Sequence, residues 1–174
     1  MSEQVAAPVQ PLVLNIQYTK DLSFEVPGAP AIFTQLRTPP HVTINLDVQV
    51  KRLEEVNTVF EVTLAIRAEG TMTPPKAATE EKPVVVFLAD LAYAGVFTLN
   101  GIPDNQQEPI LLVECPRLLF PFARNILADV TREGGFPPVL LGAIDFVGLW
   151  QQRRAAALAT AAAASEAAAA GAPN

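Results

Sequence analysis

Cysteine and histidine each occur once in this chain of 174 residues, as Cys115 and His41. A thiol beside an imidazole could form a nucleophile–base dyad of the kind used in acyl transfer. Cys115, however, precedes a proline at the expected start of a helix and has no motif around it, and a lone cysteine is more often a small buried hydrophobic residue. His41 falls on the polar face of an expected strand. We therefore expect a protein that is not an enzyme; the alternative, a thiol or acid–base enzyme, requires Cys115→Ala or His41→Ala to abolish an activity.

Carboxylates are the second group of side chains whose spacing carries information. Asp21 and Glu25 lie in the segment 12–26, where apolar residues at even positions alternate with mostly polar residues at odd positions. A period of two predicts a β-strand with one face in a core. The other face would display Asp21 and Glu25 to water or to a cationic partner.

The composition restricts the possible partners. The formal net charge is −6, which argues against nucleic acid because neutralising phosphates requires Lys and Arg. Half of the residues are apolar, as in a folded domain rather than a disordered chain. No glycine-rich phosphate loop occurs and a single cysteine makes a Cys-based zinc site implausible, so we expect no cofactor and no metal.

Residues 1–4 lack the features of a secretory signal, and the alanine-rich tail is too weakly hydrophobic for a membrane span. We expect a cytoplasmic protein without direct membrane insertion.

Three further segments have the pattern of strands. Alternation predicts strands over 41–51 and 56–67, and the short polar turn between them indicates an antiparallel hairpin. The segment 84–96 is apolar on both faces apart from Asp90, so its strand must be covered on both sides, or on one side by something outside the chain. Gly95 suggests a bulge or bend there. Residues 70–82 are expected to form a mobile polar loop.

Two helices are expected after an irregular crossing loop at 97–108. The first spans 116–132, with an apolar stripe at steps of three and four and Gly134-Gly135 at its end. Pro121 is awkward inside this helix, because proline removes a hydrogen bond. Asp145 is the expected cap of a second helix that begins at Phe146. From 155 to 170 the chain is almost pure alanine, which predicts a fraying helix or a disordered tail.

Several blocks of this sequence resemble signatures of the SecB export-chaperone family. The first-strand block is Tyr18-Thr19-Lys20-Asp21-Leu22-Ser23-Phe24-Glu25 with Pro27 and Ala29-Pro30, and the first-helix block is Cys115-Pro116 with Leu119-Phe120-Pro121-Phe122-Ala123-Arg124. The later turn and the start of the second helix are Gly134-Gly135-Phe136-Pro137-Pro138 and Ile144-Asp145-Phe146. Together these blocks cover most of residues 12–150, and the proline inside the helix is part of the family's pattern.

The resemblance implies an α+β fold, in which a four-stranded antiparallel sheet has two helices packed on one face. It implies a flexible N-terminus at 1–11, a chaperone domain at 12–154 and an alanine-rich tail at 155–174. The family assembles as a homotetramer, a dimer of dimers. It keeps unfolded preproteins competent for export and delivers them to SecA, the ATPase of the export channel, without a cofactor.

The family docks SecA through acidic side chains on the outer face of the sheet. Matching by motif carries this role to Asp21, Glu25, Leu88 and Asp90. Asp90 stands where the family usually has glutamate, which keeps the charge but shortens the reach. The alternative is a strand face that is merely solvated.

Unfolded clients expose aromatic and aliphatic side chains, which a holding chaperone must bind without reading sequence. The candidates for a client groove are Phe97, Leu99, Phe146, Leu149 and Trp150. The alternative that these residues are core stays open, because periodicity does not separate groove from core. A second alternative is a SecB-like chaperone dedicated to a toxin–antitoxin system. Two departures from the family are the loop at 70–82, which is longer than usual, and the unusually alanine-rich tail.

Overall fold

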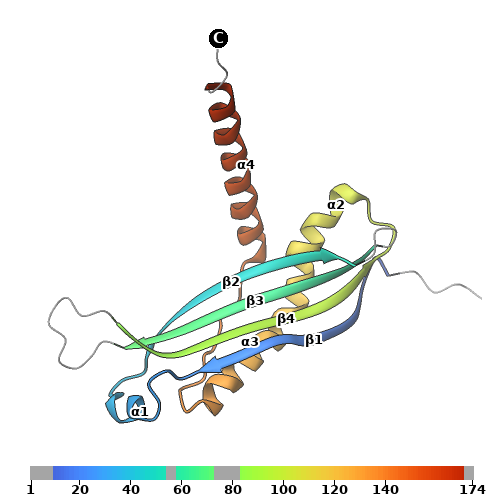
Figure 1. Cartoon of the computed structure of the whole chain (residues 1–174). Helices are drawn as coiled ribbons and strands as arrows, with labels where there is room; N and C mark the ends of the chain where they lie inside the picture. The colour runs from blue at the N-terminus through green and yellow to red at the C-terminus, as the bar shows by residue number, and fades with distance from the viewer. Residues whose placement is uncertain (1–9, 54–57, 73–82, 171–174) are drawn as a thin grey trace, which may run out of the picture. The chain divides into compact units, whose positions relative to one another are not determined.

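The computed structural model describes residues 10–53, 58–72 and 83–170, with side chains up to residue 162. Four strands form one antiparallel sheet in the order β1-β4-β3-β2 (Figure 1). The strands are β1 (Leu12–Glu25), β2 (His41–Arg52), β3 (Val59–Met72) and β4 (Val84–Leu99). The helices are α1 (Ala31–Gln35), α2 (Asp104–Pro109), the π-helical segment η1 (Ile110–Glu114), α3 (Cys115–Glu133) and α4 (Phe146–Ala170). The chain divides into two compact units, Met1–Gly142 and Ala143–Asn174.

The strands follow the alternation predicted from the sequence, and the antiparallel sheet is confirmed. β3 extends through Gly70–Met72, residues expected to lie in the loop, and pairs there with the start of β4. The remainder of that loop, 73–82, lies outside the described residues, as do 1–9, 171–174 and the turn residues 54–57. For 1–9 of the expected flexible N-terminus, 73–82 of the expected mobile loop and the end of the tail, the expectations therefore fall on positions that the structure does not describe.

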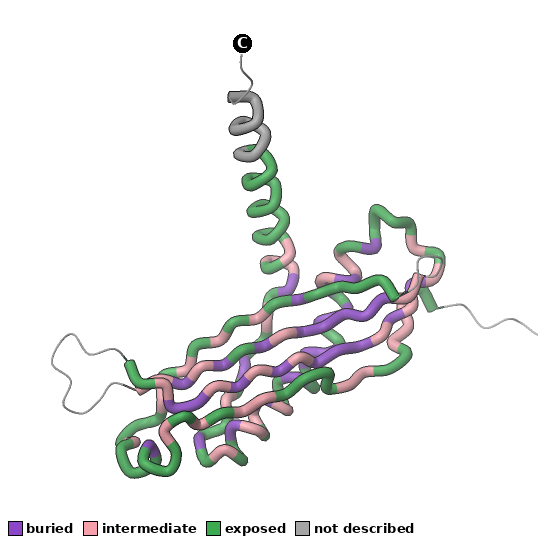
Figure 2. Tube along the Cα trace, viewed as in Figure 1, coloured by how far each residue is buried: buried purple, intermediate pink, exposed green. Residues whose placement is uncertain are grey.

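Helix α3 covers one face of the sheet, called the inner face here, and contacts β4, β3 and β1. Burial is concentrated in β3 and β4, whereas β1 and β2 at the edges are more exposed (Figure 2). Leu64 and Phe97 of the sheet and Leu119 and Leu127 of α3 are fully buried in this core. A Cβ on Gly95 would lie 2.8 Å from Leu119 Cδ2. The glycine therefore allows the close approach of α3, and it does not mark a register shift within β4.

The register shifts of the β1–β4 pair lie in β1 instead, at Asn15 and Lys20. Each is an extra residue in β1, and one extra residue moves every later side chain to the opposite face. Between the two bulges the polarity of β1 is inverted. The prediction of one uninterrupted apolar face is wrong there: Ile16 is 57% exposed, and Gln17 points inward with a buried Oε1 that has no hydrogen-bond partner among the described residues.

The crossing loop expected at 97–108 is shorter than predicted. β4 continues to Leu99, and α2 begins at Asp104. The side chain of Gln107 is buried and donates hydrogen bonds to the carbonyl of Ile102 (3.1 Å) and to Asp104 Oδ1 (2.9 Å). These bonds fix the entry to a helical path that runs on through η1 into α3.

Helix α3 matches its prediction to within one residue at either end. Gly134 follows it because a Cβ there would overlap the Phe24 ring, and Gly135 adopts a φ of +86°, which favours glycine.

In the second unit, Asp145 Oδ1 accepts a hydrogen bond from the Gly148 N–H (3.0 Å), which confirms the predicted cap of α4. α4 continues as a helix to Ala170. Among the described residues, no helix is long and apolar enough to cross a membrane.

Candidate functional sites on the two faces of the sheet

The β1–β4 register brings the four predicted docking residues onto one face. Asp21 lies opposite Ala92, Ser23 opposite Asp90, and Glu25 opposite Leu88. Because residues directly opposite one another share a face, all of these side chains lie on the outer face, away from α3. Asp21 and Glu25 are exposed, and the side chain of Asp90 is 41% exposed. This group is called the carboxylate face below.

Two further carboxylates join the carboxylate face from the other half of the sheet. Asp47 of β2 lies opposite Ala65 of β3, and Ala65 lies opposite Ala92, so that only two alanines separate Asp47 from Asp21 across the sheet. Glu69 of β3 lies opposite Leu88. A shallow hollow of about 280 Å³ lies at this position, and its lining includes Asp21, Asp47 and Asp90. Asp47 falls within the strand expected at 41–51, whereas Glu69 lies beyond the strand expected at 56–67, and neither pattern predicts a register that would join them to Asp21.

Arg67 supplies a cation within the carboxylate face. Its Nη1 lies 3.2 Å from Asp90 Oδ2, and the two side chains are 50% and 41% exposed. An ion pair this exposed contributes little free energy, because water screens it and two long side chains must be ordered. Arg67 therefore offsets part of the negative charge without removing Asp90 from the surface.

The bulge at Lys20 has its own partner, the largely buried Glu61. Lys20 Nζ lies 2.7 Å from Glu61 Oε2, and the Tyr18 hydroxyl donates a hydrogen bond to Glu61 Oε1. The hydrogen bonds from Lys20 and Tyr18 lower the pKa of Glu61, and the bond to Glu61 raises the pKa of Tyr18. The first-strand signature therefore does two things: Tyr18 and Lys20 hold Glu61, and the extra residue returns Asp21 to the outer face.

An apolar hollow of about 350 Å³ lies at the inner face. It is bounded by the start of β2 with the prolines before it, by Phe87 of β4, and by the segment 137–141 that follows α3. Every residue that lines it is apolar: Pro39, Pro40, Val42, Ile44, Phe87, Pro137, Pro138, Val139, Leu140 and Leu141. Leu140 is 74% exposed at its surface. This site is called the apolar hollow below.

The candidates for a client groove occupy different environments. Phe97 and Leu99 have no exposed surface and lie on the inner face, which fits the alternative that they are core. Phe146 is 2% exposed. Leu149 is 39% exposed, and Trp150, partly exposed, carries the guanidinium of Arg154 over its ring, 5.8 Å from the centroid. The segment 137–141 was missed, because an apolar run interrupted by prolines shows neither a helical nor a strand period.

The thiol of Cys115 is not activated. Cys115 has no exposed surface, and burial, with a smaller contribution from Glu114, raises its pKa to about 12. The thiol is therefore neutral at physiological pH, whereas a nucleophilic cysteine needs a lowered pKa. His41 is exposed at the start of β2.

A scan against protein families matches residues 5–157 to SecB, described as preprotein translocase subunit SecB. The chain belongs to the SecB family. A protein-export protein SecB of Acidiphilium cryptum is 71% identical over 151 residues, which cover 84% of this chain and 91% of that protein. A protein-export protein SecB of Granulibacter bethesdensis is 69% identical over 145 residues, 83% of each chain. This SecB-family chain is accordingly a protein-export chaperone.

The fold is also that of a solved SecB-like chaperone of Mycobacterium tuberculosis, in complex with a ChAD peptide from the HigA1 antitoxin. The two chains superpose with a TM-score of 0.60, over 78% of this chain and 91% of that one. Their sequences are 14% identical, so the likeness concerns the fold alone.

Proposed function

We propose that this chain holds unfolded precursor proteins in the cytoplasm through the apolar hollow and presents the carboxylate face to SecA. The observation that carries the proposal is the placement of the two surfaces on opposite sides of one sheet. Val42, Ile44 and Phe87 line the hollow from the inner face, whereas Asp21 and Asp90 lie on the outer face. A client and a motor protein could then be bound at the same time.

The apolar hollow suits an unfolded client. Unfolded chains expose aromatic and aliphatic side chains, and burial of apolar surface contributes about 25 cal/mol per Å² without reading sequence. Binding only the unfolded form opposes folding by mass action, so holding requires no ATP. The peptide bound to the M. tuberculosis protein of the same fold supports peptide binding here. Leu149 and Trp150 stay as further candidates for client contact, while the burial of Phe97, Leu99 and Phe146 favours a packing role for them.

The client site is tested by one substitution in the hollow and one matched control. Leu140→Ser removes the most exposed leucine of the lining, and Leu158→Ser removes a comparably exposed leucine, 66% exposed, on α4. The assay is the suppression of aggregation of a chemically unfolded precursor. We expect Leu140→Ser to weaken suppression and Leu158→Ser to leave it unchanged. Equal behaviour of both variants would remove the hollow from the client site.

The carboxylate face suits a partner rich in Lys and Arg. Complementary charges across such a surface increase the association rate and fix orientation more than they add affinity. Asp21, Glu25 and Asp90 supply the charges, and Leu88 supplies apolar contact between them.

The SecA site is tested by calorimetry with Asp21→Ala plus Glu25→Ala, and separately with Asp90→Asn. The control is Asp129→Ala plus Glu133→Ala, which changes the net charge equally at exposed positions of α3. We expect weaker SecA binding for the first two variants and wild-type binding for the control. Unchanged affinity in the first two would exclude these residues from SecA docking.

The relatives favour a function in protein export over that of a chaperone dedicated to a toxin–antitoxin system. The SecB proteins at 71% and 69% identity are named protein-export proteins. The SecB-like chaperone with an antitoxin peptide shares only 14% of its sequence with this chain.

We also propose the homotetramer, a dimer of dimers, that the family resemblance implies. Leu118 and Phe122 of α3 are each 46% exposed, which leaves apolar surface that a second copy could cover. Light scattering of the purified chain, alone and with SecA, measures the mass. A monomer at micromolar concentration would contradict this assembly.

A further inference from the structure

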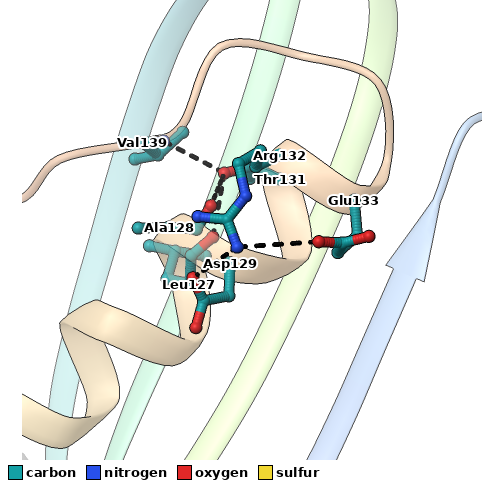
Figure 3. A network of polar contacts seen from close by, with 7 residues as sticks. All are labelled: Leu127, Ala128, Asp129, Thr131, Arg132, Glu133 and Val139. Atoms are coloured by element: carbon teal, nitrogen blue, oxygen red, sulfur yellow. Dashed lines mark hydrogen bonds and ion pairs between the residues drawn. The ribbon is translucent and has the colours of Figure 1, made fainter.

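We propose that Thr131 is a positioning residue for client binding, because its buried hydroxyl fixes the wall of the apolar hollow. This inference rests on the proposed role of the hollow as the client site. Thr131 lies in the last turn of α3 and has no exposed surface. Its Oγ1 donates toward the carbonyl oxygens of Leu127 (2.9 Å) and Ala128 (3.1 Å), and accepts a hydrogen bond from the Val139 N–H at 3.0 Å (Figure 3).

The segment that receives this bond has no regular secondary structure. Residues 137–142 form neither helix nor strand, yet 137–141 make one side of the hollow. Pro137 and Pro138 have no N–H and therefore cannot donate a backbone hydrogen bond. Val139 is therefore the first residue after Phe136 whose N–H can anchor the wall, and that N–H is bound to Thr131 Oγ1.

Two anchors at either side of the prolines hold the wall. At the first, the Phe136 N–H donates to the Thr131 carbonyl (3.1 Å), and the Phe136 ring packs on Phe87, with 5.0 Å between centroids. At the second, the Thr131 hydroxyl holds Val139, the immediate neighbour of the exposed Leu140. Removing the hydroxyl leaves the first anchor in place and frees the part of the wall that contacts a client.

The neighbouring charged residues do not perform this function. Arg132 pairs with Asp129 (2.9 Å) and lies 3.6 Å from Glu133, and these side chains are 56–77% exposed on the outside of the same turn (Figure 3). Thr131, by contrast, has no exposed surface, and a hydrogen bond in the core is protected from competition with water.

The consequence for binding is a loss of preorganisation. A wall that is already ordered in the free protein needs no further ordering when a client binds. Because one hydrogen bond contributes about 1 kcal/mol, client affinity should fall about fivefold when this bond is removed. SecA affinity should not change, since the carboxylate face lies on the other side of the sheet.

The test compares Thr131→Val, which keeps the shape and deletes the hydroxyl, with Thr131→Ser, which restores it. Thr160→Val is the matched control, because the exposed Thr160 hydroxyl also donates to the carbonyl four residues earlier, that of Ala156 (2.9 Å). The readouts are the affinity for a labelled unfolded peptide rich in Phe and Leu, hydrogen exchange of the Val139 amide, SecA affinity and the urea midpoint. Should Thr131→Val fail to fold, Val139→Pro deletes the same N–H at a half-buried position, and peptide affinity and SecA affinity are then the readouts.

We expect faster exchange of the Val139 amide and weaker peptide binding in Thr131→Val, both restored in Thr131→Ser, with Thr160→Val unchanged. Wild-type peptide affinity together with faster Val139 exchange would overturn the inference. So would a parallel loss of SecA affinity, because that would indicate a general loss of structure. If the wild-type chain fails to bind the peptide, or if Leu140→Ser has no effect, the proposed client site itself is refuted.

Discussion

Removing the charge of Lys20 should destabilise the fold because the buried carboxylate of Glu61 loses its cation. In Lys20→Met, the Glu61 carboxylate, a residue 8% exposed, keeps its hydrogen bond from Tyr18 and loses the ammonium at 2.7 Å. Hydrogen bonds to charged groups contribute about 1.5–3 kcal/mol. Lys20 is 46% exposed, so solvent screening reduces the expected loss to about 1–2 kcal/mol. That corresponds to a fall in Tm of roughly 2–8 °C for a chain of this size.

The second substitution makes this prediction specific. Adding Glu61→Gln to Lys20→Met removes the buried negative charge that has lost its cation, so the double variant should be more stable than Lys20→Met alone. The measurement is urea unfolding followed by circular dichroism, at one fixed protein concentration, because association would shift the midpoint. A double variant less stable than the single one, or a single variant as stable as the wild type, would refute the reasoning.

The pH dependence has a defined sign. Hydrogen bonds from Lys20 and Tyr18 lower the pKa of Glu61 below its ordinary value of 4.5. A depressed carboxylate pKa stabilises the fold fully above the ordinary value, and this contribution is lost as the pH falls through the folded-state pKa. The difference between Lys20→Met and wild type should therefore be complete at pH 7 and shrink below pH 4.5.

Three further outcomes follow from particular contacts. Arg67→Met should tighten SecA binding about twofold at low salt, because Arg67 no longer competes with SecA for Asp90. The gain should fade as salt is added, since the lost ion pair is exposed. Calorimetry that shows no gain at low salt would contradict this competition. Gly70→Ala should cost about 1–3 kcal/mol in urea unfolding, because its Cβ would overlap the Phe87 ring, whereas Gly142→Ala, with open space around it, should be neutral. Cys115 should react with iodoacetamide only after unfolding, because its pKa is raised to about 12; rapid labelling of the native protein would show otherwise.

The sequence predicted the strands well because alternation is a local property. It placed Asp21 and Glu25 on the polar face, and they do lie on the outer face. That agreement depends on two bulges that cancel: the first, at Asn15, inverts the polarity of β1, and the second, at Lys20, restores it. The exposed Ile16 lies between them. A bulge is set by pairing with β4 and by the contact of Lys20 with Glu61, neither of which a single strand reveals.

The parts of the candidate sites that were missed depend on contacts between distant segments. Asp47 reaches the carboxylate face only through the strand order β1-β4-β3-β2, which no local pattern specifies. The wall at 137–141 has no period, and its anchoring contacts with Thr131 and Phe87 join segments that are distant in the sequence. Phe97 and Leu99 illustrate the reverse difficulty, because an apolar side chain looks the same in sequence whether it fills a core or lines a groove.

The paired bulges also limit how β1 can evolve. Loss of Lys20 alone would remove the second bulge, because Thr19 already lies opposite Tyr93 and Asp21 opposite Ala92. Asp21 and the residues after it would keep their faces, while Glu61 would lose its cation. Asn15 and Lys20 are therefore the positions at which β1 can lose one residue without turning its later side chains to the opposite face, whereas a deletion at a paired position would disturb the register.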